Sequence, residues 1–414
     1  MSVYEFILTN IDRTTKVYRG ERQEESDIPL IVLPYPFTTP CAEKHFQEMY
    51  YWDTYFTHKC LLLTKRGGQV CNNVKNFIFL LEKYGKILNG SRLHYITRSQ
   101  PPFFGLMLAD LLKNEPGLLT ADVAFSWLEK EYGFWMTKRK AKNSLQFYGY
   151  DPVDKKEYGN PWYFNEVYVK TYAERTGIQM ENTAENNAHV IAECESGWDF
   201  SPRFYGKTMH YNPVDLNSLL YADELLLSAF AARLGKEAEA LSYKEAARVR
   251  KEKMQRFMKK DGVYFDYDFV REKCSNVVSC AGLYPYFVGL DDDAEGFRKT
   301  LEQLEREYGV VACRWEQDNF QWAEPNSWAP LTYIAVAAAE RLGLKEIAKR
   351  LADKYLAVTD NIYQKTQRLW EKYNANTGDL DVVSEYGTPE MLGWTAGVYT
   401  AFYHYRENGY ERLI

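Results

Sequence analysis

Asp199 lies in a short stretch whose residue types suit acid catalysis. The stretch, residues 195–204, reads ESGWDFSPRF and follows a helix-like run over residues 182–194 that stops at Gly197. Loops that a rigid scaffold holds often carry chemistry. Between Trp198 and Phe200 a carboxyl is partly desolvated, which favours its neutral form and lets it donate a proton near neutral pH. We therefore predict a catalytic acid at Asp199; an aspartate that caps the next helix is the alternative.

Aromatic residues are frequent throughout the chain. They make up 16% of it, with 33 tyrosines and 10 tryptophans, and they cluster at residues 50–52, 147–150, 161–164 and 284–287. Flat rings with a polar edge suit the faces of sugars, so the clusters predict a cleft lined by rings with hydrogen-bonding edges. The alternative is that the tyrosines only pack between helices.

Four stretches of the chain combine such rings with carboxylates, amides and basic groups. The first is HFQEMYYWDTYF at residues 45–56, and the second joins NGSR at 89–92 to RSQPPFF at 98–104. The third is the Asp199 stretch with its continuation NPVDLN at 212–217. The fourth joins QWAEPNSWAP at 321–330 to the Glu385-Tyr386 pair and GWTAG at 393–397. Together they resemble the trehalase family of glycoside hydrolases over about residues 45–400.

The resemblance implies a fold, a reaction and two catalytic groups. The fold is all-α, an (α/α)6 barrel of inner and outer helices with short β and loop insertions, and the reaction cleaves an α-glycosidic bond with inversion. By the family's SGWD motif Asp199 is the general acid, and by its EY pair, nine residues before Trp394, Glu385 is the general base. Such carboxyls stand about 6.5–9.5 Å apart, which leaves room for the attacking water. Glu324 competes as the base, and without the resemblance Glu385 would be a solvated loop acid.

The resemblance also implies a set of sugar-binding residues and no cofactor or metal. Aspartate and asparagine hydrogen-bond hydroxyls, arginine adds charge-assisted donors, and tryptophan stacks on ring faces. The family's positions that remain recognisable are Trp52, Asp53, Asn89, Arg98, Gln100, Trp198, Arg203, Asn217 and Trp322. The same stretches offer five further candidates for substrate binding, His45, Phe46, Glu324, Trp328 and Trp394. The six histidines contain no HExxH or similar pair, and all except His45 are predicted to be structural.

Several positions depart from the family pattern, and they concern the substrate. His45 stands where the family has an arginine, and Ala323 stands where an aspartate follows the QW pair. Residues 379–384 replace a glycine-rich run, and residues 162–195 lack the RPES pattern. A buried sugar hydroxyl left without a partner costs about 1–3 kcal/mol. The precise sugar therefore stays open.

The predicted function is hydrolysis of a small α-linked disaccharide or glycoside, trehalose or a related α-glucoside. A different small α-glucoside or α-mannoside, such as a glycosylglycerate, is the alternative. A sugar 2-epimerase uses a similar helical barrel but relies on paired histidines, and only His45 lies in a motif. A non-catalytic sugar-binding protein is a further alternative, against which the retained Asp199 and Glu385 argue.

Apolar periodicity predicts about a dozen helices that position these stretches. Residues 215–234 are strongly apolar and predict a buried helix, whereas 237–259 carry charges on most faces and predict an outer one. Alternation of the two kinds suggests an inner and an outer ring. A bend or break is expected within 345–373, and a short strand or hairpin at 261–267. The other predicted helices are 70–83, 101–112, 120–135, 182–194, 294–308, 328–342 and 392–405. Residues 1–43 are expected to be extended and packed on a single domain of residues 1–414.

Composition excludes several classes of protein. The net charge of -6 leaves no basic excess for nucleic acid, and no run approaches the roughly 18 apolar residues of a membrane span. Seven cysteines without a CxxC pair favour a reduced compartment, and residues 1–18 show no secretory signal, so a cytoplasmic location is predicted. The expected partner is a small carbohydrate, and the oligomeric state is left open.

Overall fold

The computed structural model describes residues 1–20, 27–317 and 319–413, and these are predominantly helical. Nine very short strands and several 3-10 turns interrupt the helices, so the predicted all-α class holds. The α-helices are α1 (Val3–Asn10), α2 (Tyr51–Leu63), α3 (Gly67–Tyr84), α4 (Phe104–Asn114), α5 (Ala121–Lys138), α6 (Tyr168–Thr176), α7 (Ala184–Glu195), α8 (Val214–Arg233), α9 (Glu237–Met258), α10 (Tyr284–Phe287), α11 (Ala294–Leu304), α12 (Ala329–Arg341), α13 (Lys345–Thr366) and α14 (Gly393–Glu407).

The strands pair antiparallel in four small sheets, β1 with β2, β3 with β6 and then β7, β4 with β5, and β8 with β9. Their bounds are β1 (Thr15–Lys16), β2 (Phe37–Thr38), β3 (Tyr211–Asn212), β4 (Lys259–Lys260), β5 (Val263–Tyr264), β6 (Tyr267–Asp268), β7 (Lys273–Cys274), β8 (Asn326–Trp328) and β9 (Lys372–Asn374). The short strand or hairpin expected at 261–267 overlaps β5, which forms a hairpin with β4, whereas β6 begins at Tyr267 in another sheet.

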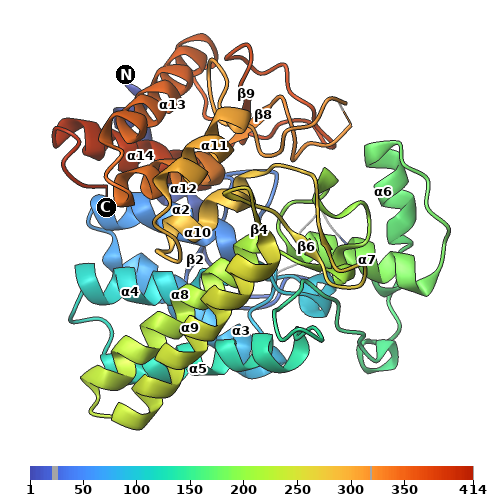
Figure 1. Cartoon of the computed structure of the whole chain (residues 1–414). Coiled ribbons are helices and arrows are strands. Elements are labelled where there is room, and N and C mark those ends of the chain that lie inside the picture. Colours follow the sequence, from blue (N-terminus) through green and yellow to red (C-terminus); the bar gives the residue numbers. More distant parts are fainter. Residues whose placement is uncertain (21–26, 318, 414) are drawn as a thin grey trace.

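Inner and outer helices differ in how much of their circumference is buried. The inner helices α2, α8, α12 and α14 are buried nearly all the way round, and in α2 and α8 the buried residues include charged ones as well as apolar ones. Helix α9 instead buries only Ala240, Ala247, Arg250, Met254 and Met258. It runs along the outside of α8 (Figure 1). The predictions of a buried helix at 215–234 and an outer one at 237–259 are confirmed.

The break expected within residues 345–373 is a helix end followed by a strand. Helix α13 stops at Thr366 because Gln367 adopts the left-handed conformation, with φ 58°. The chain then extends into β9, whose residues Lys372 and Tyr373 pair with Trp328 and Ser327 of β8. This pairing brings residues 370–374 beside the QWAEPNSW stretch, although about 50 residues separate them in sequence.

The beginning of the chain is more regular than predicted. Helix α1 starts with a capping box, in which Ser2 and Glu5 bond each other's backbone N–H groups. The helix packs on α14, where the Tyr4 and Tyr403 rings stack 4.2 Å apart. The expectation that residues 1–43 are extended is therefore wrong for residues 3–10. One hydrophobic cluster spans Val3 to Tyr405, which favours a single domain of residues 1–414; that division stays a prediction.

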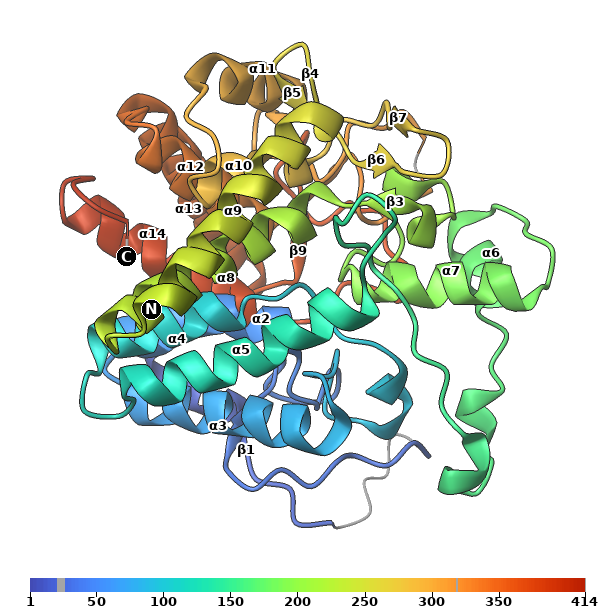
Figure 2. The same ribbon diagram turned by 60° about the horizontal axis from the view of Figure 1, so that its bottom comes forward.

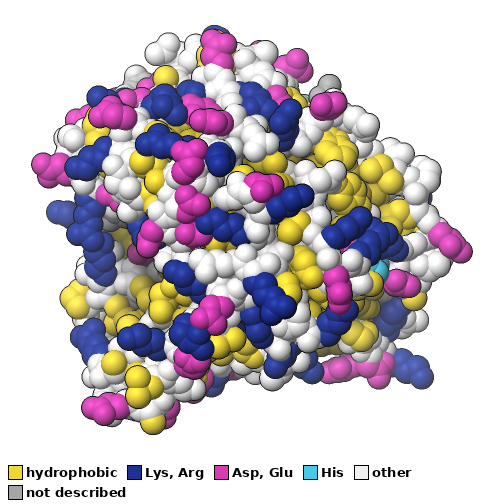
Figure 3. All heavy atoms as spheres, viewed as in Figure 1, with side chains coloured by type: hydrophobic (Ala, Val, Ile, Leu, Met, Phe, Trp, Pro, Cys, Tyr) yellow, Lys and Arg dark blue, Asp and Glu magenta, His cyan; other side chains and the backbone are white. Residues whose placement is uncertain are grey.

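Lys, Arg, Asp and Glu side chains are mixed over the surface. Figure 3 shows both signs interspersed on one face, with small apolar areas between them. A nucleic-acid interface needs massed basic groups, and this face does not gather them. Within the described residues, none of the helices is both long and apolar enough to cross a bilayer.

Candidate active site

A cavity of about 270 Å³ opens where the inner helices begin. Its walls come from the starts of α2, α12 and α14, from the turn after α7, and from α6 with the loop before it. The lining residues are Phe46, Tyr50, Trp52, Asp53, Asn89, His94, Tyr95, Arg98, Gln100, Glu166, Tyr168, Thr171, Arg175, Cys194, Gly197, Asp199, Phe200, Gln321, Trp322, Trp328, Glu371, Tyr386, Met391 and Trp394. The cavity thus gathers residues from all four motif stretches.

Stacked tryptophans build one wall of the cavity. Trp322 lies parallel to Trp328, with ring centroids 3.8 Å apart, and to Trp198 on its other side at 5.5 Å. Trp52 and Trp394 meet the stack from the starts of α2 and α14. Trp198 is fully buried and is not a lining residue. It therefore supports Trp322 from behind, whereas the other four rings border the cavity.

Asp199 enters the cavity from the turn that follows α7. Gly197 shapes this turn with φ 74°, and a Cβ there would lie 2.9 Å from the Trp52 indole nitrogen. Burial raises the pKa of the Asp199 carboxyl, while the Arg175 and Arg98 guanidiniums oppose the rise. A carboxyl in this setting keeps its proton to higher pH than an exposed one, as acid catalysis requires.

Glu385 lies beside the Asp199 turn. Its side chain is 2% exposed, one oxygen pairs with Arg175 Nη1 at 3.0 Å, and the other accepts the Phe200 N–H at 3.1 Å. Burial raises the pKa of Glu385 to about 8, with Arg175 opposing the shift and Asp199 adding to it. Glu385 is thus no solvated loop acid. It is also absent from the cavity lining, and its two oxygens are bonded to Arg175 and to the Phe200 amide.

Glu371 is a cavity carboxylate that the sequence analysis missed. It comes from the residue before β9 and is 2% exposed. One oxygen contacts Lys372 Nζ at 2.7 Å, and the other accepts the Tyr386 hydroxyl at 2.8 Å. Sequence reasoning placed it inside a helix over 345–373. Residues 369–374 read LWEKYN and show no regular alternation, so no local pattern marked Glu371 as a cavity residue.

Asp53 is a further carboxyl in the cavity lining, which contains four in all with Asp199, Glu371 and Glu166. Burial raises the pKa of Asp53 to about 8, and the nearby charges of Glu371 and Asp199 add to the rise. Carboxyls this close cannot all be charged without strong repulsion. The cavity therefore holds groups that can donate protons and groups that can accept them.

The predicted sugar-binding residues divide into those that line the cavity and those that do not. Phe46, Trp52, Asp53, Asn89, Arg98, Gln100, Trp322, Trp328 and Trp394 line it together with Asp199. The Asn89 amide donates to the Cys194 carbonyl at 3.1 Å, and Gln100 accepts the Trp52 N–H at 3.2 Å. Their placement was predictable because each stands in a motif stretch.

Arg203 and Asn217 are buried in the protein interior away from the cavity. Arg203 is fully buried and pairs with both Asp215, at 2.7 Å, and Asp266, at 2.9 Å. Asn217 is equally buried, and its amide donates to the carbonyl of Gln146 at 3.0 Å. Substrate contact by either residue is not supported, since their polar groups already bond within the protein.

His45 and Glu324 lie in separate hollows. His45 is exposed and lines a depression near α1 and the end of α13, because the chain turns away at Lys44, with φ 65°. Glu324 pairs with Arg306 Nη2 at 2.6 Å in a hollow next to Asn376. Neither residue reaches the cavity, so neither substrate contact by His45 nor the base role of Glu324 is supported.

Helix α6 and the loop before it supply further lining residues that were missed. Glu166, Tyr168, Thr171 and Arg175 face the cavity from this segment. It lies against α7 at one side of the molecule (Figure 2). The Tyr168 ring also lies 5.9 Å from the guanidinium of Arg98. No element was predicted for this segment, because its helix has only nine residues and few of them are apolar.

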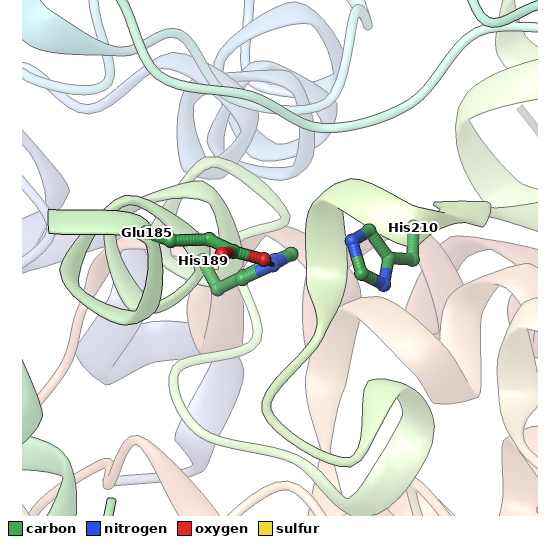
Figure 4. Close-up of side chains that lie close together, drawn as sticks. All are labelled: Glu185, His189 and His210. Atoms are coloured by element: carbon green, nitrogen blue, oxygen red, sulfur yellow. Dashed lines mark ion pairs between the residues drawn. The ribbon is translucent and has the colours of Figure 1, made fainter. Parts of the chain in front are cut away.

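Among the described residues, one group of side chains is spaced as metal ligands are, namely Glu185, His189 and His210 (Figure 4). The Met209 N–H donates to His189 Nδ1 at 3.1 Å. A neutral His189 therefore carries its proton on Nε2, the atom that a metal would need, whereas a metal-bound histidine normally donates from its other nitrogen. The Lys207 charge also lowers the pKa of His189, after burial and His210. The group does not fit a metal site.

Comparisons with known proteins give a consistent result. The family model described as trehalase matches residues 6–406. A periplasmic trehalase of Xanthomonas axonopodis pv. citri (strain 306) is 32% identical over 411 residues, which cover 92% of this chain and 70% of the relative. A periplasmic trehalase of Escherichia coli (strain SMS-3-5 / SECEC) is 30% identical over 408 residues, with the same shares.

Solved structures share the fold. The neutral trehalase of Saccharomyces cerevisiae superposes with a TM-score of 0.76 at 24% identity, over 98% of this chain and 80% of that one. A mannosylglycerate hydrolase from Thermus thermophilus, in complex with glucose, gives 0.62 at 15% identity, over 89% and 95%. These neighbours confirm the predicted (α/α)6 barrel.

The predicted cytoplasmic location is contradicted by the comparisons, because the bacterial relatives are periplasmic proteins. The prediction rested partly on the odd number of cysteines. All seven are free thiols, and six of them are buried within the fold. The number of cysteines therefore does not decide the compartment.

Proposed function

The chain belongs to the trehalase family of glycoside hydrolases, and from this premise we propose that it hydrolyses trehalose to two glucose molecules with inversion at the attacked carbon. The observation that carries the proposal is the convergence of Asp199 and Glu371 on one small cavity walled by tryptophans. At about 270 Å³ the cavity is near the lower end of the range for small-molecule sites, about 300–1,000 Å³. That size suits a disaccharide rather than a polysaccharide.

Asp199 is the proposed general acid. Its pKa is raised by burial, so the carboxyl can remain protonated until the glycosidic oxygen needs its proton. Gln321 Nε2 donates to the Asp199 carbonyl at 2.7 Å and fixes the turn that carries it. The proton passes to the leaving oxygen as the bond to the anomeric carbon breaks.

For the general base we propose Glu371, while Glu385 stays the prediction made from the sequence. Glu371 lines the cavity, and Lys372 at 2.7 Å balances its charge. Glu385 pairs with Arg175 on the Asp199 side and has a pKa of about 8, so most of it is protonated at neutral pH. A base must be ionised and must face the water opposite the leaving group. Glu371 lines the cavity and Glu385 does not, which favours Glu371 as the base.

The remaining lining residues suit a sugar. Trp52, Trp322 and Trp394 offer ring faces and indole edges, and Asn89 and Arg98 offer polar donors. Glucose in the first subsite would lie against these groups with its anomeric carbon between Asp199 and Glu371. Glu166 and Arg175 of the α6 segment would then border the second sugar.

A sugar 2-epimerase finds less support in the geometry. Proton transfer by paired histidines needs two imidazoles in the site, yet among the chain's six histidines only His94 lines the cavity. Burial lowers the pKa of His94 well below its usual value, and nearby Arg98 and Arg92 lower it further. A single neutral imidazole cannot replace a histidine pair.

The test is hydrolysis of trehalose by the purified chain, followed by proton NMR. We expect glucose to appear, with one β-glucose and one α-glucose formed per trehalose before mutarotation, since water attacks opposite the α bond. Sucrose, maltose, kojibiose and an α-mannosylglycerate serve as comparison substrates. If only α-glucose is formed at first, inversion is rejected. An epimerised product would favour the epimerase, and binding without turnover would favour a non-catalytic protein.

A further inference from the structure

Lys372 carries a fully buried ammonium group beside the cavity. Its side chain is 0% exposed and lies between the rings of Trp328, at 4.8 Å, and Tyr386, at 5.0 Å. Burying a cation is costly unless a charged partner compensates it. That partner is Glu371, 2.7 Å from Lys372 Nζ. Lys372 is not itself a lining residue, so it does not meet the substrate.

A chain of hydrogen bonds continues from Lys372 to the proposed acid. Lys372 Nζ also reaches Gln321 Oε1, at 3.3 Å, and Gln321 Nε2 donates to the Asp199 carbonyl at 2.7 Å. The side-chain oxygen of Gln321 therefore accepts from the Lys372 ammonium, and its NH2 group donates to the Asp199 carbonyl. This is the only orientation of the amide that satisfies both partners. The backbone of Asp199 and the carboxylate of Glu371 are thus tied together through Gln321 and Lys372.

Lys372 is the cation in contact with Glu371 among the described residues. Asp53, the Cys41 thiol and the Tyr386 hydroxyl also interact electrostatically with Glu371, and none of these three groups is positive. Lys372 therefore offsets the repulsion between Glu371 and the nearby carboxyls. Without it, Glu371 would face Asp53 with no adjacent positive charge.

We propose that Lys372 is a positioning residue for hydrolysis, which holds the Glu371 carboxylate in place and, through Gln321, sets its separation from Asp199. This rests on the proposed function and on the base role of Glu371. Inverting hydrolysis admits one water between the carboxyls, at a separation of about 6.5–9.5 Å. A displacement of about 1 Å can cost about 10²-fold in rate, so a rigid tie between the carboxyls has a direct kinetic effect.

The first experiment compares Lys372→Met and Lys372→Arg with the wild type on trehalose. We expect Lys372→Met to lower kcat by about 10²-fold with little change in KM, since the side chain acts through Glu371 and not through the sugar. The acidic limb of the kcat/KM profile should move to higher pH, because a carboxylate that loses its cation is protonated more easily. Lys372→Arg keeps the positive charge, so the acidic limb of its kcat/KM profile should stay at the pH of the wild type. An unchanged kcat and profile in Lys372→Met would overturn the proposal.

A double-mutant cycle separates positioning from a general loss of structure. If Lys372 acts through Glu371, then adding Lys372→Met to Glu371→Gln lowers the residual kcat no further. This double variant also removes both charges, so it leaves no unpaired buried ion to unfold the chain. A further loss of tenfold or more in the double variant, with an unchanged thermal midpoint, would mean that Lys372 acts by another route.

Glucosyl fluoride distinguishes failure of this proposal from failure of the proposed function. Fluoride leaves without a proton, so Asp199→Asn should recover activity on it, whereas Glu371→Gln and Lys372→Met should not. If Glu371→Gln hydrolyses trehalose at the wild-type rate, then the base assignment fails. If Glu371→Gln is inactive while Lys372→Met behaves as the wild type, the positioning role alone is rejected.

Discussion

Burial of carboxyls dominates the chemistry of the cavity at the scale of single residues. It raises the pKa of Asp53 and of Glu385 to about 8, and it raises that of Asp199 as well. Arg175 opposes the rise at both Asp199 and Glu385. The cavity therefore holds more protons at neutral pH than exposed carboxyls would, which suits a reaction that begins with proton donation.

Substitution of each catalytic candidate should give a distinct result. We expect Asp199→Asn and Glu371→Gln to lower kcat on trehalose by about 10²–10⁴-fold, because each loses one proton-transfer step. Glu385→Gln should lose less, since an amide still accepts the Phe200 N–H. Rates at saturating trehalose measure these losses. If Glu385→Gln were the more damaging of the two glutamate variants, then the base predicted from the sequence would be favoured over Glu371.

Azide gives a second readout for the same carboxylates. With Glu371→Gly, azide can replace water as the nucleophile because it is already an anion and needs no base, while Asp199 still protonates the leaving oxygen. We expect added azide to raise the rate and to give a β-glucosyl azide, visible by mass spectrometry and NMR. Asp199→Gly is the matched control. It should not be rescued on trehalose, since its leaving group still lacks a proton donor.

Arg175 should set the upper pH limit of activity. Because its charge opposes the rise in the pKa of Asp199, Arg175→Met should raise that pKa further. The acid must be protonated to work, so the basic limb of the kcat/KM profile should move to higher pH. Arg175→Lys keeps the charge and serves as the control. A basic limb that stays in place in Arg175→Met would show that another group limits activity at high pH.

Residue type could predict much of the site, and packing decided the rest. Trp52, Asp53, Arg98 and Trp322 stand in motif stretches and do line the cavity. Arg203 has the same residue type as Arg98, but Asp215 and Asp266 hold it in the interior. Asp266 is 63 residues away from Arg203 in sequence, so no local pattern could separate an arginine that binds substrate from one that stabilises the fold.

At the scale of elements, long apolar patterns were predictable and short segments were not. The pattern over 182–194 predicted α7, Ala184–Glu195, to within two residues, and that over 237–259 predicted α9 almost completely. Helix α6 has nine residues, and β9 has three. Their periodicity is too short to stand out, and β9 exists only because β8 pairs with it. Glu371 was missed for that reason.

The turn after α7 offers a test of how local geometry serves the site. Gly197, with φ 74°, and Gly85, with φ 73° at the end of α3, carry the same backbone demand, but only at Gly197 would a Cβ meet Trp52, at 2.9 Å. We expect alanine at either position to lower the free energy of unfolding by about 1 kcal/mol through backbone strain. Gly197→Ala should also lower kcat/KM, because it displaces the Trp52 ring.

Chemical denaturation and trehalose kinetics measured on both glycine variants separate the two effects. Gly85→Ala acts as the matched control, since a Cβ added at Gly85 would have no heavy atom within 4 Å outside the immediate chain. Equal kcat/KM values in the two variants would mean that the Trp52 contact has no part in shaping the site.

Across the whole molecule, several carboxyls are enclosed without a basic partner. Glu131 of α5 and Asp223 of α8 are both buried, and burial raises the pKa of Glu131 to about 8 and that of Asp223 well above its usual value. Glu193 behind the Asp199 turn also has a pKa of about 8, through burial. The folded chain therefore holds these carboxyls in their protonated form, and their deprotonation lowers the free energy of unfolding.

Stability should accordingly fall on the alkaline side. A carboxyl whose pKa is higher in the folded than in the unfolded chain contributes its full stability below about pH 4, and that contribution is lost as the pH rises through about 8. We expect the free energy of unfolding to decline from pH 5 to pH 9, and Glu131→Gln to reduce the slope. Glu129→Gln, at an exposed position of the same helix, is the control. Urea titrations at each pH measure the effect, and parallel slopes in wild type and Glu131→Gln would contradict it.

The seven free thiols bear on how the chain can be produced. A chain that folds without disulfide bonds needs neither an oxidant nor a disulfide isomerase. Material made under reducing conditions should therefore reach the same active form as material exported to an oxidising space, and dithiothreitol should leave its turnover of trehalose unchanged.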